Sequence, residues 1–189
     1  MPSPIGHLLG GAAVYAGGTN RDTRSTVLLV IALVGSMVPD LDFVPGILIG
    51  NMRAFHHGVS HSLAFAVLFG GVIFGLAHAV DKVLARRTAV FALLAYSSHV
   101  ILDFVSVNEG TRGVPLLWPF SDEQFGVNLR LFGYFRYEDS GIPSVLHWGN
   151  LVPFSRELLI LGSVVLMLLR KERIGRSLRA RRRRRFGET

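Results

Sequence analysis

The sequence predicts an all-α fold: a polytopic membrane bundle of about five helices with a metal site at one membrane face. Half of the 189 residues are hydrophobic, yet the formal net charge is +7. The polar residues are gathered into short stretches between long apolar ones, as in proteins that expose helices to lipid and loops to water. Histidines and aspartates also recur at the ends of the apolar stretches, and this predicts the site.

Five apolar stretches define the expected helices, and they cover residues 5–17, 25–38, 61–80, 88–107 and 152–169. The third and fourth are about twenty residues long, which is enough to cross a hydrocarbon core of about 30 Å. The first two are shorter, so they either span a thinned region or pack as buried core helices. We expect residues 1–169 to form the membrane-embedded domain and residues 170–189 a basic cytoplasmic tail.

Basic residues predict how the bundle is oriented. If every apolar stretch crosses once, 15 of the 20 Lys+Arg fall on the side that holds the C-terminal tail, and 5 fall on the other side. Because basic loops mark the cytoplasmic face, we expect an inner-membrane, multi-pass protein whose acidic side faces outward. The start of the chain lacks the basic lead of a secretory signal, so the membrane segments themselves would direct insertion.

The basic tail also invites a nucleic-acid reading. It follows directly after an apolar helix, and no aromatic interleaving or nucleic-acid fold signature accompanies it. A topology anchor that touches anionic lipid headgroups accounts for it better. The expected partner is therefore membrane lipid, with no nucleic acid. The chain has no cysteines, so any metal ligands must be His, Asp or Glu.

Seven ionisable residues lie in or at the ends of apolar stretches, where such groups are costly and usually functional. With alternating crossings, four separate stretches bring them to the same outward face. They are His7, Asp40, Asp42, His56, His61, His99 and Asp103. His78 lies at the opposite end of the third stretch and does not belong to this set.

The spacings within this set suit metal binding. His99 and Asp103 are four residues apart and share one helix face. His57 and His61 have the same spacing, and His56 and His61 are five residues apart across an expected helix start. We expect Gly58 to let the backbone turn between these histidines. An extended backbone at residues 39–42 would point both aspartates the same way. Carboxylates with imidazoles commonly hold divalent ions, which activate water and stabilise charge on phosphoryl or acyl oxygens.

Each element has a simpler explanation when it is taken alone. Asp40 or Asp42 could cap a helix. His61 could mark an interfacial helix start, His99 could be hydrogen-bonded inside the bundle, and His7 could lie among lipid headgroups. Asp103 is harder to explain in this way, because a carboxylate inside an apolar helix needs a cation or a donor.

The order of these motifs resembles the LexA-regulated, membrane-bound, metal-dependent hydrolase family. The resemblance covers residues 4–120 and includes the early helix Gly6-His7-Leu8-Leu9-Gly10. It continues through Pro39-Asp40-Leu41-Asp42, His56-His57-Gly58-Val59-Ser60-His61-Ser62, His99-Val100-Ile101-Leu102-Asp103 and a Gly-rich segment ending at Pro119-Phe120. The family has an arginine where this chain has His57. A more distant likeness to zinc-dependent phospholipase C points to phosphoester chemistry by analogy only.

The resemblance implies a metal-dependent hydrolase, and we expect it to cleave a phosphoester in a lipid or lipid-linked substrate. Divalent ions, zinc above all or else manganese or iron, would bind the seven residues. Asp42 or Asp103 would act as general base. Arg112 and His57 would hold the anionic group of the substrate. Two alternatives stay open: a metal-binding transporter or sensor without hydrolytic activity, and a structural membrane protein with a satisfied polar cluster.

Overall fold

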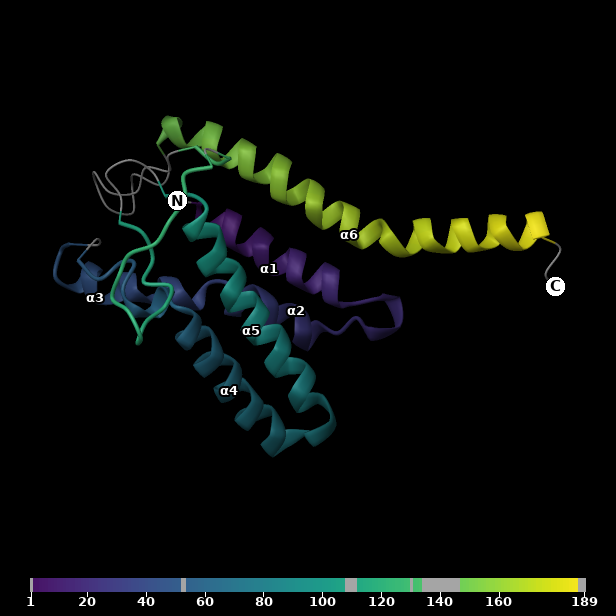
Figure 1. Ribbon diagram of the computed structural model, residues 1–189, viewed down its shortest axis with the longest axis horizontal. Helices are drawn as coiled ribbons and strands as arrows, with labels where there is room; N and C mark the ends of the chain where they lie inside the picture. Colours follow the sequence, from purple (N-terminus) through teal and green to yellow (C-terminus); the bar gives the residue numbers. More distant parts are fainter. Residues whose placement is uncertain (1, 52–53, 108–111, 130, 134–146, 187–189) are drawn as a thin grey trace.

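The fold is a bundle of helices packed around α5, with α6 lying along one side (Figure 1). The computed structural model describes residues 2–51, 54–107, 112–129, 131–133 and 147–186, with side chains up to residue 171. Its helices are α1 (Pro4–Gly18), α2 (Thr26–Gly35), α3 (Phe43–Leu48), α4 (Leu63–Val80), α5 (Lys82–Phe104) and α6 (Leu151–Phe186). Short 3-10 turns are η1 (Arg21–Thr23), η2 (Val38–Asp42), η3 (Val59–His61) and η5 (Trp148–Asn150). The predicted all-α fold is confirmed, and these residues form no strand beyond two isolated bridges.

Helix α5 occupies the centre because its small residues allow three other helices to approach it. It packs against α1, α2 and α4, and its fully buried residues include Ala85, Ala92 and Ala95. Helices α1 and α2 also lie close together. A Cβ on Gly11 would meet the carbonyl oxygen of Ala32 at 2.4 Å, so only glycine allows this approach. The helix that carries His99 and Asp103 is therefore held from three sides.

Helix α5 starts earlier than its apolar pattern predicts. Asp81 accepts hydrogen bonds from the backbone N–H groups of Val83 and Leu84, which makes it an effective N-cap. The basic residues from Lys82 onward therefore lie in the first turns of α5, and α4 and α5 meet in a tight turn. Hydropathy alone placed these residues in a connection because it does not detect a cap.

Two further boundaries differ from the predicted ones. A short helix, α3, follows directly after Asp42, so the described chain holds six α-helices where about five were expected. Helix α6 continues to Phe186 through the predicted basic tail, because arginine, lysine and alanine all favour helix. Figure 1 shows the second half of α6 extending beyond the rest of the bundle.

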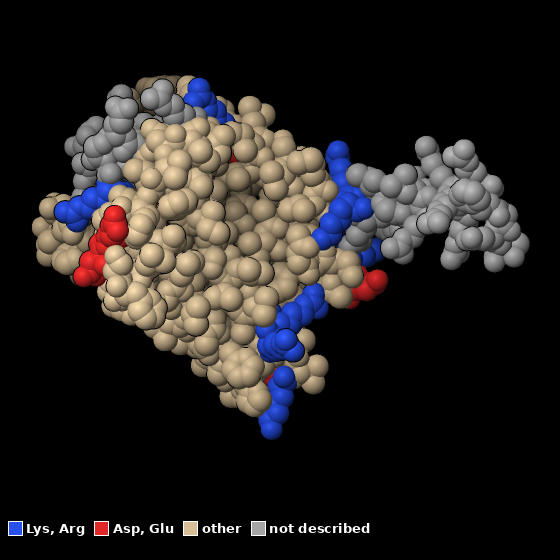
Figure 2. Space-filling view, viewed as in Figure 1, with Lys and Arg blue, Asp and Glu red and all other residues tan. Residues whose placement is uncertain are grey.

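Length and composition mark two described helical segments as able to cross a membrane, Leu63–Val80 and Trp148–Lys171. The pair Thr26–Gly35 and Val38–Leu48, bent by 46°, would make a third if it acts as one span. Helix α5 does not satisfy the same test, although a crossing was expected there. Figure 2 shows a broad uncharged surface with Lys and Arg gathered near the α4–α5 turn and where α6 leaves the bundle. This distribution is typical of a protein in a lipid environment.

Candidate metal centre

The C-terminal half of α5 supplies the centre of the cluster. His99 and Asp103 lie one turn apart on its buried face, and both side chains have 0% exposure. His99 Nε2 lies 3.1 Å from Asp103 Oδ2. His99 Nδ1 lies 2.7 Å from the carbonyl oxygen of Ser36. Since a carbonyl can only accept, Nδ1 carries the proton and Nε2 is directed at Asp103 with a lone pair in the neutral ring.

Helix α1 brings His7 against α5. The His7 ring stacks on His99, with ring centroids 3.7 Å apart, and His7 Nε2 lies 3.5 Å from Asp103 Oδ1. Asp103 thus has an imidazole at each of its two oxygens. His7 is only 2% exposed, so it faces the interior of the bundle.

Asp40 and Asp42 enter from η2. The sequence predicted an extended backbone here, and this is wrong: residues 38–42 form a 3-10 turn that begins at Val38 and has Pro39 in its first turn. Both carboxylates still reach the cluster, Asp40 Oδ1 at 3.4 Å from His99 Nε2 and Asp42 Oδ2 at 3.1 Å from His61 Nδ1. Asp42 stands at the N-cap position of α3 but makes no capping hydrogen bond, so the helix-capping alternative does not describe it.

The segment before α4 supplies three more imidazoles. His56, His57 and His61 are all buried, and the turn between them differs from the expected one. The left-handed residue is His57, with φ +59°, whereas Gly58 has φ −75°. Gly58 is needed for space, since a Cβ there would meet the carbonyl oxygen of Phe55 at 2.9 Å. A non-glycine residue in the left-handed region is uncommon and often lies at a functional site.

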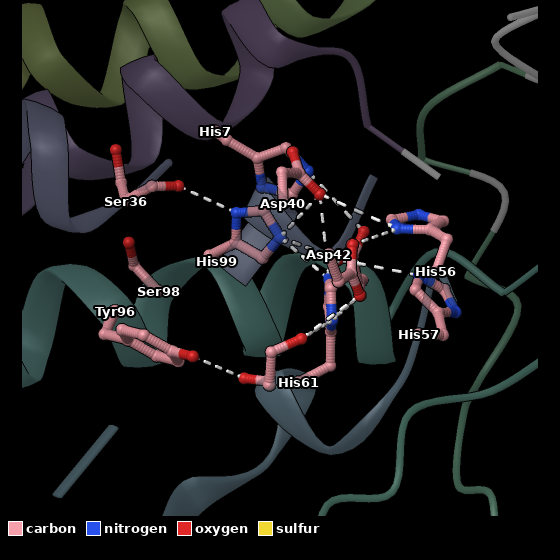
Figure 3. Close-up of polar contacts among 12 residues, drawn as sticks. His7, Ser36, Asp40, Asp42, His56, His57, His61, Tyr96, Ser98 and His99 are labelled. Atoms are coloured by element: carbon pink, nitrogen blue, oxygen red, sulfur yellow. Dashed lines mark hydrogen bonds and ion pairs between the residues drawn. The ribbon is translucent and has the colours of Figure 1, made fainter. Parts of the chain in front are cut away.

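All seven predicted ligands, together with His57, converge on one region of the structure. Figure 3 labels each of them except Asp103, which joins the cluster through its contacts with four imidazoles. His61 Nε2 lies 3.2 Å from His99 Nε2 and 3.5 Å from Asp103 Oδ2. His57 Nε2 lies 3.7 Å from the same Asp103 oxygen. Two ligands bound at about 2.1 Å to one ion lie roughly 3.0–3.4 Å apart. The observed separations are close to this spacing.

Several buried atoms of the cluster have no hydrogen-bond partner. These atoms include both Asp103 oxygens and His57 Nε2. Leaving such groups unsatisfied is costly, and a cation among them would remove the cost. Four sets of three or four side chains are close enough to share an ion: His56-His57-His61, Asp40-Asp42-His56-His61, His7-Asp40-His99 and His61-His99-Asp103. The donor set of imidazoles and carboxylates therefore fits a divalent metal ion.

The acids around His61 change its protonation in the metal-free protein. Burial alone would lower the pKa of His61, but hydrogen bonds with Asp40 and Asp42 outweigh burial and raise the pKa to about 9. His57 shows the opposite balance, because burial lowers its pKa to about 4. A metal ion can bind a nitrogen of His61 only when that nitrogen carries no proton, so metal binding there would release a proton.

Two predictions concern residues outside the ligand set: Arg112 was expected to hold the substrate's anionic group, and His78 to lie away from the site. Arg112 is exposed, and its carbonyl oxygen accepts a hydrogen bond from His57 Nδ1 at 2.9 Å. The structure thus ties Arg112 to His57 through the backbone. His78 is exposed near the far end of α4 and contacts Phe74, away from the cluster, as expected.

Sequence reasoning missed two residues that support the site. Tyr96 is buried on the same face of α5 as His99 and Asp103, and its hydroxyl donates to the carbonyl oxygen of Ser60 at 2.6 Å. The spacing of three and seven residues along α5 could have indicated this. Glu157 of α6 is also fully buried, and it accepts hydrogen bonds from Ser3 ahead of α1. Its position inside an apolar stretch was the available signal.

Comparison with known proteins places the chain in a membrane family. Residues 1–173 match the model of the YdjM inner membrane protein family. The inner membrane protein YbcI of Escherichia coli (strain K12) is 35% identical over 101 residues, which is 52% of this chain and 57% of that relative. The chain thus spans little more than half the length of this curated relative. No solved structure matches. The match covers most of the chain, which therefore belongs to the YdjM inner membrane protein family.

Proposed function

We propose that this protein is a membrane-bound, metal-dependent hydrolase that cleaves a phosphoester in a lipid or lipid-linked substrate. The observation that carries the proposal is the cluster of five imidazoles and three carboxylates, in which both oxygens of Asp103 face imidazoles and have no backbone or hydroxyl donor. A cluster that served only stability would pair these atoms with donors. The metal-binding part of the proposal rests on this geometry, and the reaction type rests on the resemblance and on the chemistry of such ions.

The imidazoles of His7, His56, His57, His61 and His99 and the carboxylates of Asp40 and Asp103 would hold one or two divalent ions. Bound there, such ions lower the pKa of a water molecule and offset charge on a phosphoryl oxygen. Zinc suits this mixture of nitrogen and oxygen donors, as do manganese and iron.

We infer that a carboxylate other than the two expected acts as general base. Asp42 accepts from several donors, and Asp103 is surrounded by imidazoles. Asp40 is the most accessible of the three, with 16% side-chain exposure against 10% for Asp42 and 0% for Asp103. Its Oδ1 faces His99 and His61 and would bind metal, which would leave Oδ2 to accept a proton. We therefore assign the proton of the attacking water to Asp40. Arg112, whose exposed side chain belongs to the residue that accepts from His57, would attract the anionic group of the substrate.

Metal content tests the first half of this proposal. Detergent-purified wild type is analysed for bound metal beside His99→Ala, with His78→Ala as the matched control, since His78 is an exposed histidine outside the cluster. We expect at least one equivalent of a transition metal in wild type and in His78→Ala, and a loss in His99→Ala with the helical circular dichroism unchanged. Equal metal content in both variants would contradict the assignment.

Turnover tests the second half. Metal-loaded protein is assayed on p-nitrophenyl phosphodiesters and on phospholipids in mixed micelles, with Asp40→Asn as the comparison. We expect phosphoester hydrolysis that falls about 10²- to 10⁴-fold when the base is removed. Metal binding without hydrolysis of any ester would instead favour the transporter or sensor alternative.

The site is proposed to face outward, with the C-terminus in the cytoplasm. The distribution of basic residues supports this orientation. Because the chain has no cysteines, single cysteines introduced as Asp122→Cys and Lys82→Cys report their side of the membrane cleanly. An impermeant maleimide should label Asp122→Cys in intact spheroplasts and Lys82→Cys only after lysis. The reverse pattern would invert the orientation.

A further inference from the structure

The carboxylate of Asp42 differs from the other two in the cluster because donors surround it. We propose that Asp42 does not bind metal but orients two of the imidazoles that do, and that Ser60 and Tyr96 hold it in place. This inference rests on the metal site of the proposed function. It changes the role of one residue that was expected to be both a ligand and a catalytic base.

Four donors converge on the two oxygens of Asp42. His56 Nδ1 lies 3.0 Å from Oδ1. At Oδ2, His61 Nδ1 lies at 3.1 Å, Ser60 Oγ at 3.1 Å and the backbone N–H of Gly58 at 3.4 Å. An ionised carboxylate has about four lone-pair positions. Oδ2, with three donors, has no free position, so a metal ion could bind it only by displacing a hydrogen bond. Oδ1 already accepts from His56 and keeps one lone pair.

The same contacts decide which nitrogen of each ring faces the cluster. Asp42 is an acceptor, so the Nδ1 atoms of His56 and His61 carry protons, and Nε2 keeps the lone pair in each neutral ring. His61 Nε2 then points at His99, Asp103 and Asp40, at 3.2–3.7 Å. Hydrogen bonds from the nitrogen opposite the metal are the usual means of orienting ligand histidines.

The other two tautomers are set by backbone carbonyls. His99 Nδ1 donates to the carbonyl oxygen of Ser36, and His57 Nδ1 donates to that of Arg112. The rings of His57, His61 and His99 thus turn Nε2 inward by the same arrangement, and for His61 the oxygen that accepts from Nδ1 belongs to Asp42. His56 Nδ1 lies against the same carboxylate. His56 and His61 come from one short, sharply turned segment, and the two oxygens of Asp42 accept from both of them.

Ser60 connects Asp42 to the centre of the bundle. The Ser60 hydroxyl contacts both Asp42 Oδ2 and His61 Nδ1 at 3.1 Å. The carbonyl oxygen of Ser60 accepts from the hydroxyl of Tyr96, which is 2% exposed. Tyr96 lies on α5 one turn before His99. The helix that supplies His99 and Asp103 therefore also fixes the segment that supplies His61.

Metal affinity distinguishes a positioning residue from a ligand. Zinc binding to detergent-purified protein is measured by competition with a chelator for wild type, Asp42→Asn and Tyr96→Phe. We expect Asp42→Asn to keep the wild-type number of zinc equivalents while its affinity falls about 10- to 100-fold. Tyr96→Phe should weaken binding roughly 2- to 10-fold, because one hydrogen bond is lost at a distance from the ions. Loss of a zinc equivalent in Asp42→Asn, or an unchanged affinity, would overturn the inference.

A second measurement works even if wild type binds no metal, which would refute the proposed function alone. In protein with ¹⁵N-labelled histidine, the Nδ1–H signals of His56 and His61 should be shifted downfield by their carboxylate partner. Asp42→Asn should move these two signals and leave those of His57 and His99, whose partners are carbonyls, in place. Unmoved signals of His56 and His61 would show that Asp42 does not orient them.

Discussion

Two carboxylates are withdrawn from solvent at the same end of the bundle, Asp103 in α5 and Glu157 in α6, and each has 0% exposure. Glu157 accepts hydrogen bonds from the backbone N–H of Ser3, at 2.7 Å, and from the Ser3 hydroxyl. Neither oxygen of Asp103 has a backbone or hydroxyl donor, and both face imidazole nitrogens at 3.1–3.7 Å. One acid is satisfied by backbone and hydroxyl donors, and the other faces imidazoles that could hold a metal ion together with it.

The difference teaches that burial alone does not identify a metal ligand. Both acids lie in apolar helices, where a carboxylate is costly. The cost at Glu157 is offset by donors next to the first turn of α1, where N–H groups lack helical partners. The cost at Asp103 is not offset in this way. We therefore read Glu157 as a clamp between α6 and α1, and Asp103 as the centre of the candidate metal site.

The sharpest test of this comparison is Asp103→Ala. We expect it to abolish metal binding, lowering affinity at least about 100-fold, because four imidazoles lose their shared anionic partner. Elemental analysis of detergent-purified protein measures this, with Asp122→Ala as an exposed acid control. Asp103→Ala protein that retains full metal content would break the comparison.

Glu157→Ala should have the opposite profile. Removing the acceptor leaves the buried Ser3 donors unpaired, so we expect the free energy of unfolding to fall by about 1–3 kcal/mol. Metal equivalents should stay at the wild-type number. Thermal unfolding in detergent, followed by circular dichroism, gives the stability change. A Glu157→Ala protein that is as stable as wild type but free of metal would show that Glu157 belongs to the metal site instead of acting as a clamp.

Gly6→Ala tests the clamp more gently. A Cβ at Gly6 would meet both Glu157 Cδ and Pro2 Cβ at 3.0 Å, so α1 and α6 must move apart slightly. We expect a loss of about 1 kcal/mol, near the lower end of the cost of overpacking. The control is Gly71→Ala on α4, where a Cβ would meet nothing within 4 Å. That variant should be neutral or stabilised by up to about 1 kcal/mol. Equal effects of the two substitutions would show that the α1–α6 contact is loose.

The composition of the cluster could be predicted from the sequence, since its members sit at matching ends of successive apolar stretches. What could not be predicted is the role of each member. His57 and Asp42 lie in the same short motifs as His56 and Asp40, and only the fold shows that Asp42 faces four donors. Spacing along a chain indicates which residues can meet, but it does not reveal which oxygen is already occupied.

Helix boundaries were predicted less well, for a related reason. Hydropathy located the apolar part of α5 and of α6 but stopped at the first charged residues. The structure continues both helices through those residues, to Lys82 at one end of α5 and to Phe186 in α6. Caps and helix propensity decide where a helix ends, and neither depends on hydrophobicity. The contact between Glu157 and Ser3 was likewise hidden, because 154 residues separate them.

The tight turn at Asp81 has a consequence for how the protein is made. Helix α5 carries charged residues at both ends and is not apolar enough to qualify as a membrane span by itself, whereas α4 is. A translocating channel that released α5 alone into lipid would expose Asp103 and the basic first turns. Because α4 precedes it directly, the two can leave the channel as one hairpin, with α1 and α2 already synthesised and ready to cover α5. The helices that cover the polar residues of α5 are thus synthesised before α5 itself.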